Sequence, residues 1–307
     1  MQISTSYLFD RAVQQMGTVQ ADLAKTQAQI AARKQVLNPS DAPDQAATIQ
    51  RLKSVIARQD NYGKSLDTIQ TRLNAEDTTL SSANDLLVRV KEIAIQSAND
   101  TLSPANRQAL GTELKGLRDQ LLSMANTQDS NGSYLFSGSR VSQPAFAVDA
   151  KGQTVYQGDQ TRMNVVVGEH RTIPINRTGS DAFVSVKRTD ANGKTSGTGF
   201  FQALDDLIAG VNSSDQVAMQ RGISETDSMH QGVLLAQASV GTDLNVVDQQ
   251  TSAIQDTTLN LKTTLSNVED LDYASAITLM NKQMLALEAA QSSFAKISQL
   301  SLFNYMK

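Results

Sequence analysis

The sequence predicts a mainly α-helical protein in which long N- and C-terminal helices form a coiled-coil-like rod and a small antiparallel β domain is inserted between them. Two observations predict this fold. Toward both ends of the chain, apolar residues recur at alternating steps of three and four, the period of a helix that packs against another helix. Between about residues 133 and 199 the apolar period becomes two, and glycines separate the short runs, as is typical of antiparallel strands.

We therefore expect five segments, with the two ends of the chain lying together. They are a terminal polymerisation helix (1–43), the N-terminal half of a helical rod (44–132), an inserted β-rich domain (133–199), the C-terminal half of the rod (200–270) and a second terminal polymerisation helix (271–307).

The first terminal helix is predicted from one packing face and one stop signal. Pro39 and Pro43 follow the apolar face, and proline both removes a backbone donor and disfavours helix in the residue before it. We expect the helix to end near Leu37. The seam, meaning the face that packs against another helix, contains Met16, Val19, Leu23, Thr26 and Ile30.

The rod is predicted from long helices on both sides of the β segment. A helix over about 44–99 comes first, and Ser103 before Pro104 predicts the N-cap of the next one. The strongest seam in the chain runs through a helix that precedes Asp270. The rod seams contain Leu66, Ile69, Leu73, Glu76, Leu80 and Leu87 in the first helix, and Leu244, Val247, Ile254, Leu261, Leu265 and Val268 in the last.

The second terminal helix begins after the acidic break at Asp270–Tyr273. Its predicted seam contains Ile277, Met280, Met284, Leu287 and Phe294. Isolated helices of this length are marginal in water, and each Leu or Ile buried on association stabilises by about 1.5–3 kcal/mol. We therefore expect the two terminal helices to be polymerisation elements that fold fully only in an assembly.

Composition excludes several kinds of function. With no cysteine among 307 residues, thiolate catalysis and sulfur-ligated metals are excluded. The two histidines, His170 and His230, have no ligand-like neighbours, so no metal site, cofactor or catalytic site is expected. A net charge of −4 gives no sign of nucleic-acid binding, and no run is apolar enough for a membrane span. The first ten residues lack the pattern of a cleavable signal.

Specific segments resemble the flagellin superfamily. Residues 87–100, LVRVKEIAIQSAND, are similar to the flagellin signature in which an arginine-rich helix precedes ELAVQAAN, and residues 268–274, VEDLDYA, are similar to flagellin's IEDADYA. Within the superfamily, residues 36–43, VLNPSDAP, resemble the NPSDDP motif of the hook–filament junction branch, with Ala42 in place of the second aspartate. The segments YLFSG (134–138), YQGD (156–159) and LFNY (302–305) are similar to that branch as well.

This resemblance implies a structural subunit of the extracellular bacterial flagellum, in a ring that joins hook to filament. It also implies unfolded export through the flagellar type III apparatus and an export chaperone on the C-terminal helix. The implied neighbours are flagellin, hook-associated protein 1 and further copies of the chain itself. Two alternatives stay open, namely flagellin itself, which would form the filament, and an intracellular coiled-coil scaffold or signalling protein.

Overall fold

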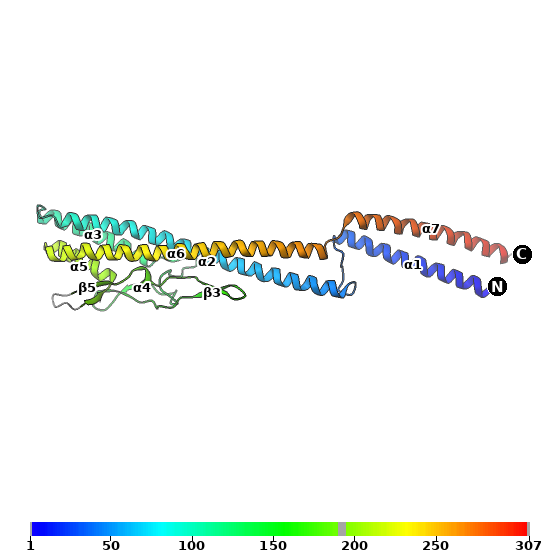
Figure 1. Ribbon diagram of the computed structural model, residues 1–307, viewed down its shortest axis with the longest axis horizontal. Coiled ribbons are helices and arrows are strands. Elements are labelled where there is room, and N and C mark those ends of the chain that lie inside the picture. Colours follow the sequence, from blue (N-terminus) through cyan, green and yellow to red (C-terminus); the bar gives the residue numbers. More distant parts are fainter. Residues whose placement is uncertain (1, 190–194, 306–307) are drawn as a thin grey trace. The chain divides into compact units, whose positions relative to one another are not determined.

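Seven helices and three pairs of antiparallel strands form the part of the chain that the computed structural model describes, which is residues 2–189 and 195–305. Side chains are described for residues 7, 9–188 and 195–296. The helices are α1 (Gln2–Ala32), α2 (Pro43–Ser97), α3 (Pro104–Ala125), α4 (Gly179–Ala182), α5 (Phe200–Ser213), α6 (Gln216–Glu269) and α7 (Tyr273–Tyr305), shown in Figure 1.

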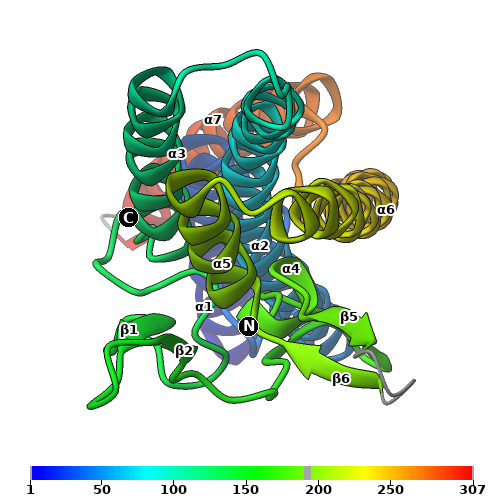
Figure 2. The ribbon, with the colours of Figure 1, turned by 90° about the vertical axis from the view of Figure 1, so that its left-hand side faces the viewer.

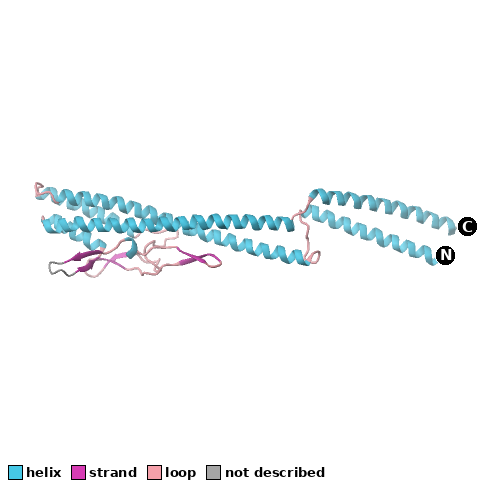
Figure 3. Ribbon diagram, in the orientation of Figure 1, coloured by secondary structure: helices cyan, strands magenta, loops and turns pink. Residues whose placement is uncertain are grey.

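In the sequence, the strands all lie between α3 and α5, and Figure 3 shows them in magenta. Each pairs only with its neighbour in sequence, which gives the sheets β1–β2, β3–β4 and β5–β6. The strands are β1 (Phe146–Val148), β2 (Thr154–Tyr156), β3 (Asn164–Gly168), β4 (Arg171–Pro174), β5 (Val186–Thr189) and β6 (Thr195–Thr198). The predicted fold class is confirmed: long helices at both ends enclose a small insertion of antiparallel strand pairs.

The chain divides into two compact units. One contains residues 2–59 and 256–305 of the described chain, and the other contains residues 60–189 and 195–255. The division falls inside α2 and α6, so each of these helices contributes to both units. The division into five segments expected from the sequence stays a prediction.

The core of the second unit is built on the predicted rod seams. In the seam of α2, Leu66, Leu73, Leu80 and Leu87 have no more than 1% of their surface exposed. On α6, Val247 and Ile254 are buried and Leu244 is half-buried. Figure 2 shows α3 and α5 beside these two helices, with the strand pairs on one side of the group. The four helices and the strands therefore share one apolar core.

Local signals place several elements as expected. The Ser103 hydroxyl accepts a hydrogen bond from the Asn106 N–H at 3.2 Å, and Pro104 is the first helical residue, so α3 begins as predicted. In the β3–β4 pair, Val165 lies opposite Ile173, in agreement with the period-two runs. Alternation along a strand sends successive side chains to opposite faces, which is why Val167 is buried whereas Val166 is exposed.

Two identical turns shape the loops of the β segment. In each, an aspartate carboxylate accepts hydrogen bonds from the N–H groups two and four residues later, and its own N–H donates to the carbonyl four residues on. The fourth residue is a glycine with positive φ, 77° at Gly132 and 78° at Gly152. Glycine has no Cβ and adopts this conformation at little cost, so the pattern D-x-x-G specifies both turns, Asp129–Ser133 and Asp149–Gln153.

The first helix ends earlier than the sequence predicts. We expected an end near Leu37, but α1 ends at Ala32. Arg33 takes a left-handed conformation with φ 60°, and the Lys34 N–H donates to the Gln29 carbonyl, which is the bonding pattern of a Schellman helix end. Glycine usually occupies that position. Because arginine occupies that position, the sequence does not mark the end of the helix at Ala32. The nearest stop signal in the sequence is the proline six residues after Arg33.

Candidate functional site

The candidate functional site is an assembly surface on the terminal helices α1 and α7, which pack against each other in antiparallel orientation. Near the two ends of the chain, the rings of Phe9 and Phe294 lie with their centroids 4.5 Å apart. At the other end of the pair, the Tyr273 hydroxyl donates to the Ile30 carbonyl at 3.4 Å. The end of α1 lies beside the start of α7 in space. The two helices therefore run back side by side and bring the beginning of the chain beside its end (Figure 1).

The inner face of α1 is the predicted seam. Thr26 is buried, and the apolar members of the seam are each partly buried in the pair. None of these apolar side chains is fully buried, because a two-helix contact covers only one side of each of them. The half-buried residues are Met16, Val19, Leu23 and Ile30.

The inner face of α7 differs in part from the predicted seam. Leu287 and Phe294 are half-buried as expected, but Ile277 is 45% exposed and Met284 is 49% exposed. The covered positions run through Ala276, Met280, Gln283 and Leu287, at alternating steps of four and three. Ile277 and Met284 each lie one position beyond that stripe, so the larger apolar residue did not mark the face that contacts α1. Sequence reasoning missed Ala276 and Gln283 because alanine and glutamine are weak markers of a packing face.

Buried polar groups weaken the contact between the two helices. The Thr26 hydroxyl is satisfied within its own helix, where it donates to the Asp22 carbonyl at 3.0 Å. The Oε1 atom of Gln283 is buried without a hydrogen-bond partner. Leaving such a group unsatisfied costs about 1–3 kcal/mol, so the pair is less stable than its apolar content suggests.

The outer faces of both terminal helices carry large apolar side chains that the chain itself does not cover. On α1, Tyr7 is 66% exposed, and on α7, Leu285 is 67% exposed. Single exposed apolar residues are ordinary, but several on one helix pair indicate an interaction surface. These residues share their exposure and lie on more than one side of each helix. We call this set the outer apolar face, and its described members are Tyr7, Phe9, Val13, Tyr273, Ile277, Leu279, Met284 and Leu285.

The linkers next to this helix pair are fixed to one another. The chain after α1 and the chain after α6 meet in an antiparallel bridge between Lys34 and Asp270. The Gln35 N–H donates to the Glu269 carbonyl at 2.9 Å, and the Leu271 N–H donates to the Arg33 carbonyl at 3.3 Å. The two polypeptide segments that connect the terminal helices to α2 and α6 are therefore bonded together as one short piece of structure.

Glu269 is the charged centre of this linker region. Its carboxylate Oε1 lies 2.7 Å from the Lys34 Nζ and 2.8 Å from the Lys53 Nζ of α2. Burial raises the pKa of Glu269, but the hydrogen bonds from the two lysines outweigh burial and leave the pKa below its ordinary value. The same contact raises the pKa of Lys34. Sequence reasoning missed this ion triad, since these residues are far apart in the chain and only the fold joins them.

The remaining predicted seam residues lie where α2 and α6 contribute to the first unit. Leu261, Leu265 and Val268 of α6 are half-buried, and on α2 Ile49 and Ile56 are buried. The seam is therefore less completely covered here than in the four-helix core, where the α2 leucines are fully buried.

The chemistry expected of an enzyme is not assembled in the described residues. His170 is exposed at the turn between β3 and β4, and His230 is half-buried on α6. Within residues 2–189 and 195–305, no three His, Cys, Asp or Glu side chains are grouped so that they could hold a metal ion. The helices in that part of the chain include none that is both long and apolar enough to span a membrane.

Comparison with protein families matches both helical ends. The model of the bacterial flagellin N-terminal helical region matches residues 3–141, and that of the bacterial flagellin C-terminal helical region matches residues 223–306. The unmatched middle contains most of the β segment, so the likeness is carried by the helices on which the candidate surface lies.

Two curated relatives are similar along the whole chain. The flagellar hook-associated protein 3 of Salmonella typhimurium is 28% identical over 316 residues, covering 99% of each protein. The flagellar hook-associated protein 3 of Escherichia coli is 28% identical over 320 residues, covering 100% of each. A flagellin of Listeria monocytogenes is 20% identical over 306 residues.

Solved structures share the fold over about three quarters of the chain. A flagellar hook-associated protein 3 from Legionella pneumophila superimposes with a TM-score of 0.66 at 21% identity, covering 72% of this chain and 98% of that one. FlgL of Xanthomonas campestris gives a TM-score of 0.62 at 22% identity, covering 71% of this chain and 99% of that one.

Proposed function

Because this chain belongs to the bacterial flagellin family, we propose that it is the structural subunit that joins the hook of the flagellum to its filament. The observation that carries the proposal is similarity to hook-associated protein 3 over the whole chain, in relatives of the same length. The chain is a structural protein and not an enzyme, and its place is in the extracellular flagellum.

The outer apolar face supplies the physical basis for assembly. Burying a Leu, Met or Phe side chain stabilises by about 1.5–3 kcal/mol, and at least eight described apolar side chains on α1 and α7 stay exposed in the single chain. A neighbouring copy that presents its own terminal helices would cover these side chains. The predicted seam residues Ile277 and Met284, which are 45% and 49% exposed, belong to this outer face and would serve between subunits.

We infer three kinds of neighbour in the assembly. Copies of the chain would surround one another in a ring, with hook-associated protein 1 on the hook side and flagellin on the filament side. The likeness to both flagellin models supports a shared way of packing, since related helices offer similar seams to each other. Before assembly, an export chaperone would hold the C-terminal helix, and the unfolded chain would leave the cell through the flagellar type III apparatus.

Deletion of the gene in the source bacterium tests the proposed position. We expect complete hooks without filaments, flagellin released into the medium, and recovery of attached filaments when the gene is returned. Electron microscopy of the hook ends gives the result directly. Attached filaments of normal number in the deletion strain would overturn the proposal.

Flagellin is the second candidate, favoured by the matching flagellin models and by the Listeria flagellin that spans 97% of this chain. The two candidates differ in abundance. A junction protein occurs in one ring per filament, whereas flagellin is the bulk of every filament. Quantitative mass spectrometry of sheared filaments separates them, and this chain should be a trace component relative to a second, abundant flagellin.

A further inference from the structure

One buried carboxyl group lies outside the assembly surface and has no complete set of partners. Glu76 occupies a seam position of α2 with none of its surface exposed. Its Oε1 accepts a hydrogen bond from the Arg177 backbone N–H at 3.3 Å, and its Oε2 has no hydrogen-bond partner. A carboxyl group in a row of leucines is costly to bury, so its presence calls for a physical explanation.

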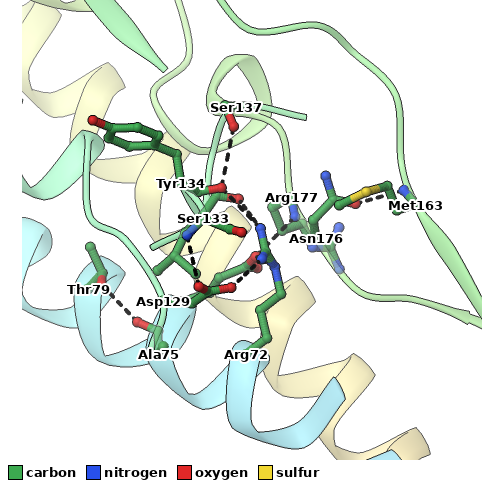
Figure 4. Close-up of polar contacts among 12 residues, drawn as sticks. Arg72, Ala75, Thr79, Asp129, Ser133, Tyr134, Ser137, Met163, Asn176 and Arg177 are labelled. Atoms are coloured by element: carbon green, nitrogen blue, oxygen red, sulfur yellow. Dashed lines mark hydrogen bonds and ion pairs between the residues drawn. The ribbon is translucent and has the colours of Figure 1, made fainter. Parts of the chain in front are cut away.

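The segment that Glu76 contacts, Asn176–Gly179, ties the β region together. The Asn176 side chain accepts from the Met163 N–H at 2.7 Å, which holds the chain leading into β3 (Figure 4). Thr178 forms a bridge with Ser137, and the Gly179 N–H donates to the Phe136 carbonyl at 2.7 Å. We call residues 176–179 the anchor segment. It joins β3–β4 to the loop after α3, so its contact with α2 is one of the attachments of the β region to the helices.

Both cations near Glu76 are already paired with other carboxylates. The Arg72 guanidinium of α2 donates to the Asp129 carboxylate at 3.0 Å and to the Tyr134 and Leu135 carbonyls at 3.1 Å (Figure 4). The Arg177 guanidinium pairs with the Asp243 carboxylate of α6. The Nε of Arg72, which has no hydrogen-bond partner, lies 3.8 Å from the Oε1 of Glu76. The facing groups from all packed elements are thus two cations and two anions that neutralise each other.

We propose that Glu76 is a proton-controlled latch: its neutral form holds the anchor segment against α2, and its ionised form releases that hold. An ionised Glu76 would add one unbalanced negative charge to a dry site in which both guanidinium groups already have carboxylate partners. A buried charge that no cation balances is strongly destabilising, and separation of the anchor segment from α2, where the Arg177 N–H contacts Glu76, would expose the carboxylate to water.

The direction of the pH effect follows from burial. Burial raises the pKa of Glu76 to about 8, and the Arg177 N–H, Arg72 and the Arg177 guanidinium offset burial only in part. A raised pKa for an acid means that the folded form keeps the proton over a range where the unfolded chain has lost it. The stabilisation is therefore fully present below the ordinary value of 4.5 and is lost as the pH rises through about 8.

Hydrogen exchange of the full-length protein tests the latch. Wild type and Glu76→Gln are compared by mass spectrometry at pH 4 and at pH 9, so intrinsic exchange rates cancel at each pH. Glutamine keeps the shape and stays neutral. At pH 4, below the ordinary value of 4.5, we expect equal exchange of peptides that contain residues 176–179. At pH 9, above the pKa of the folded form, the wild type should exchange at least about tenfold faster there.

Controls separate the latch from a merely structural role. Glu113→Gln removes a carboxylate that is exposed and paired with Arg89, and it should leave the exchange of the anchor segment unchanged at both pH values. The ¹³C shift of the Glu76 carboxyl in labelled wild type should titrate well above pH 6, which needs no variant to fold. Equal exchange of wild type and Glu76→Gln at pH 9, faster exchange of the variant at pH 4, or a Glu76 carboxyl already ionised at pH 6 would overturn the proposal.

Discussion

Phe9 and Phe294 lie ring against ring in the structure, with centroids 4.5 Å apart, although they stand near opposite ends of the chain. Both belong to helices whose apolar residues outnumber what a two-helix contact can cover. Phe9 is itself 40% exposed while it touches Phe294, so the same ring serves the inner contact and the outer apolar face. The pair of α1 and α7 therefore buries part of its apolar surface within one chain and leaves the rest exposed to neighbouring subunits.

A charge on the outer apolar face should block assembly without harming the folded chain. Leu285→Asp places a carboxylate at a position that is already largely exposed, so the free energy of unfolding of the isolated protein should change by no more than about 0.5 kcal/mol. Between subunits the same carboxylate would have to be desolvated, and filament attachment should fail. The measurements are denaturant unfolding of purified protein and electron microscopy of hooks.

Asn281→Asp is the matched control for that charge. Asn281 is an exposed polar residue of the same helix, and the substitution adds the same negative charge. Filaments should attach as in the wild type. If Asn281→Asp and Leu285→Asp impaired attachment equally, overall charge rather than the apolar face would be responsible.

Shortening a buried side chain of the rod core should lower the free energy of unfolding, whereas shortening an exposed one should not. Leu80→Ala removes a side chain with none of its surface exposed and should lower the free energy of unfolding by about 2–5 kcal/mol. Leu259→Ala, at a position of α6 that is 64% exposed, should change it by less than about 0.5 kcal/mol. Urea titration followed by circular dichroism measures both. Similar losses from the two substitutions would mean that burial in the chain does not determine its stability.

Much of the fold could be predicted from the sequence because its signals are local. The Ser103–Pro104 start of α3 and the period-two runs of β3 and β4 each act within a few residues, and the structure has both. The features that could not be predicted depend on distant partners. The end of α1 at Ala32 is joined to the chain beyond Glu269, and the hydrogen bond to Glu76 comes from Arg177, 101 residues further along the chain.

The assembly surface was predictable only in outline. Spacing predicted a seam on α1, and the structure places its members Met16 and Leu23 at half-buried positions of that helix. On α7 the covered face follows Ala276 and Gln283, and a search for large apolar residues assigned Ile277 and Met284 to the same face. When a helix has apolar residues on two sides, their spacing alone does not show which side contacts the same chain and which side faces a neighbouring subunit.

Asp159 should make the β segment sensitive to acid. Hydrogen bonds from the Ser139 hydroxyl, the Ser139 N–H and the Thr161 N–H lower the pKa of Asp159 to about 2. A lowered pKa contributes stability that is present above the ordinary value of 3.8 and lost as the pH falls through about 2. Asp159→Asn should be less stable than wild type at pH 6, and the difference should shrink toward pH 2. A constant difference across that range, in urea unfolding at each pH, would exclude this role.

Alanine substitutions at two glycines distinguish the cost of backbone strain from the cost of a steric collision. Gly132 and Gly138 both have positive φ, but a Cβ on Gly132 would meet open space whereas a Cβ on Gly138 would collide with the backbone carbonyl of Asp159. Gly132→Ala should cost only the strain of a left-handed alanine, about 1–2 kcal/mol. Gly138→Ala should cost clearly more, because the Asp159 turn must also move. Thermal unfolding of both variants gives the order, and a reversed order would contradict the packing of this turn.

Hydrogen exchange of the terminal helices, in the free protein and in hook–filament complexes, tests most directly whether α1 and α7 are completed by neighbouring subunits. Amides of residues 5–30 and 280–300 should exchange rapidly in the monomer and become strongly protected in the complexes, while the α2 core between Leu66 and Leu87 is protected in both. Strong protection of the terminal helices in the monomer, unchanged on assembly, would contradict it.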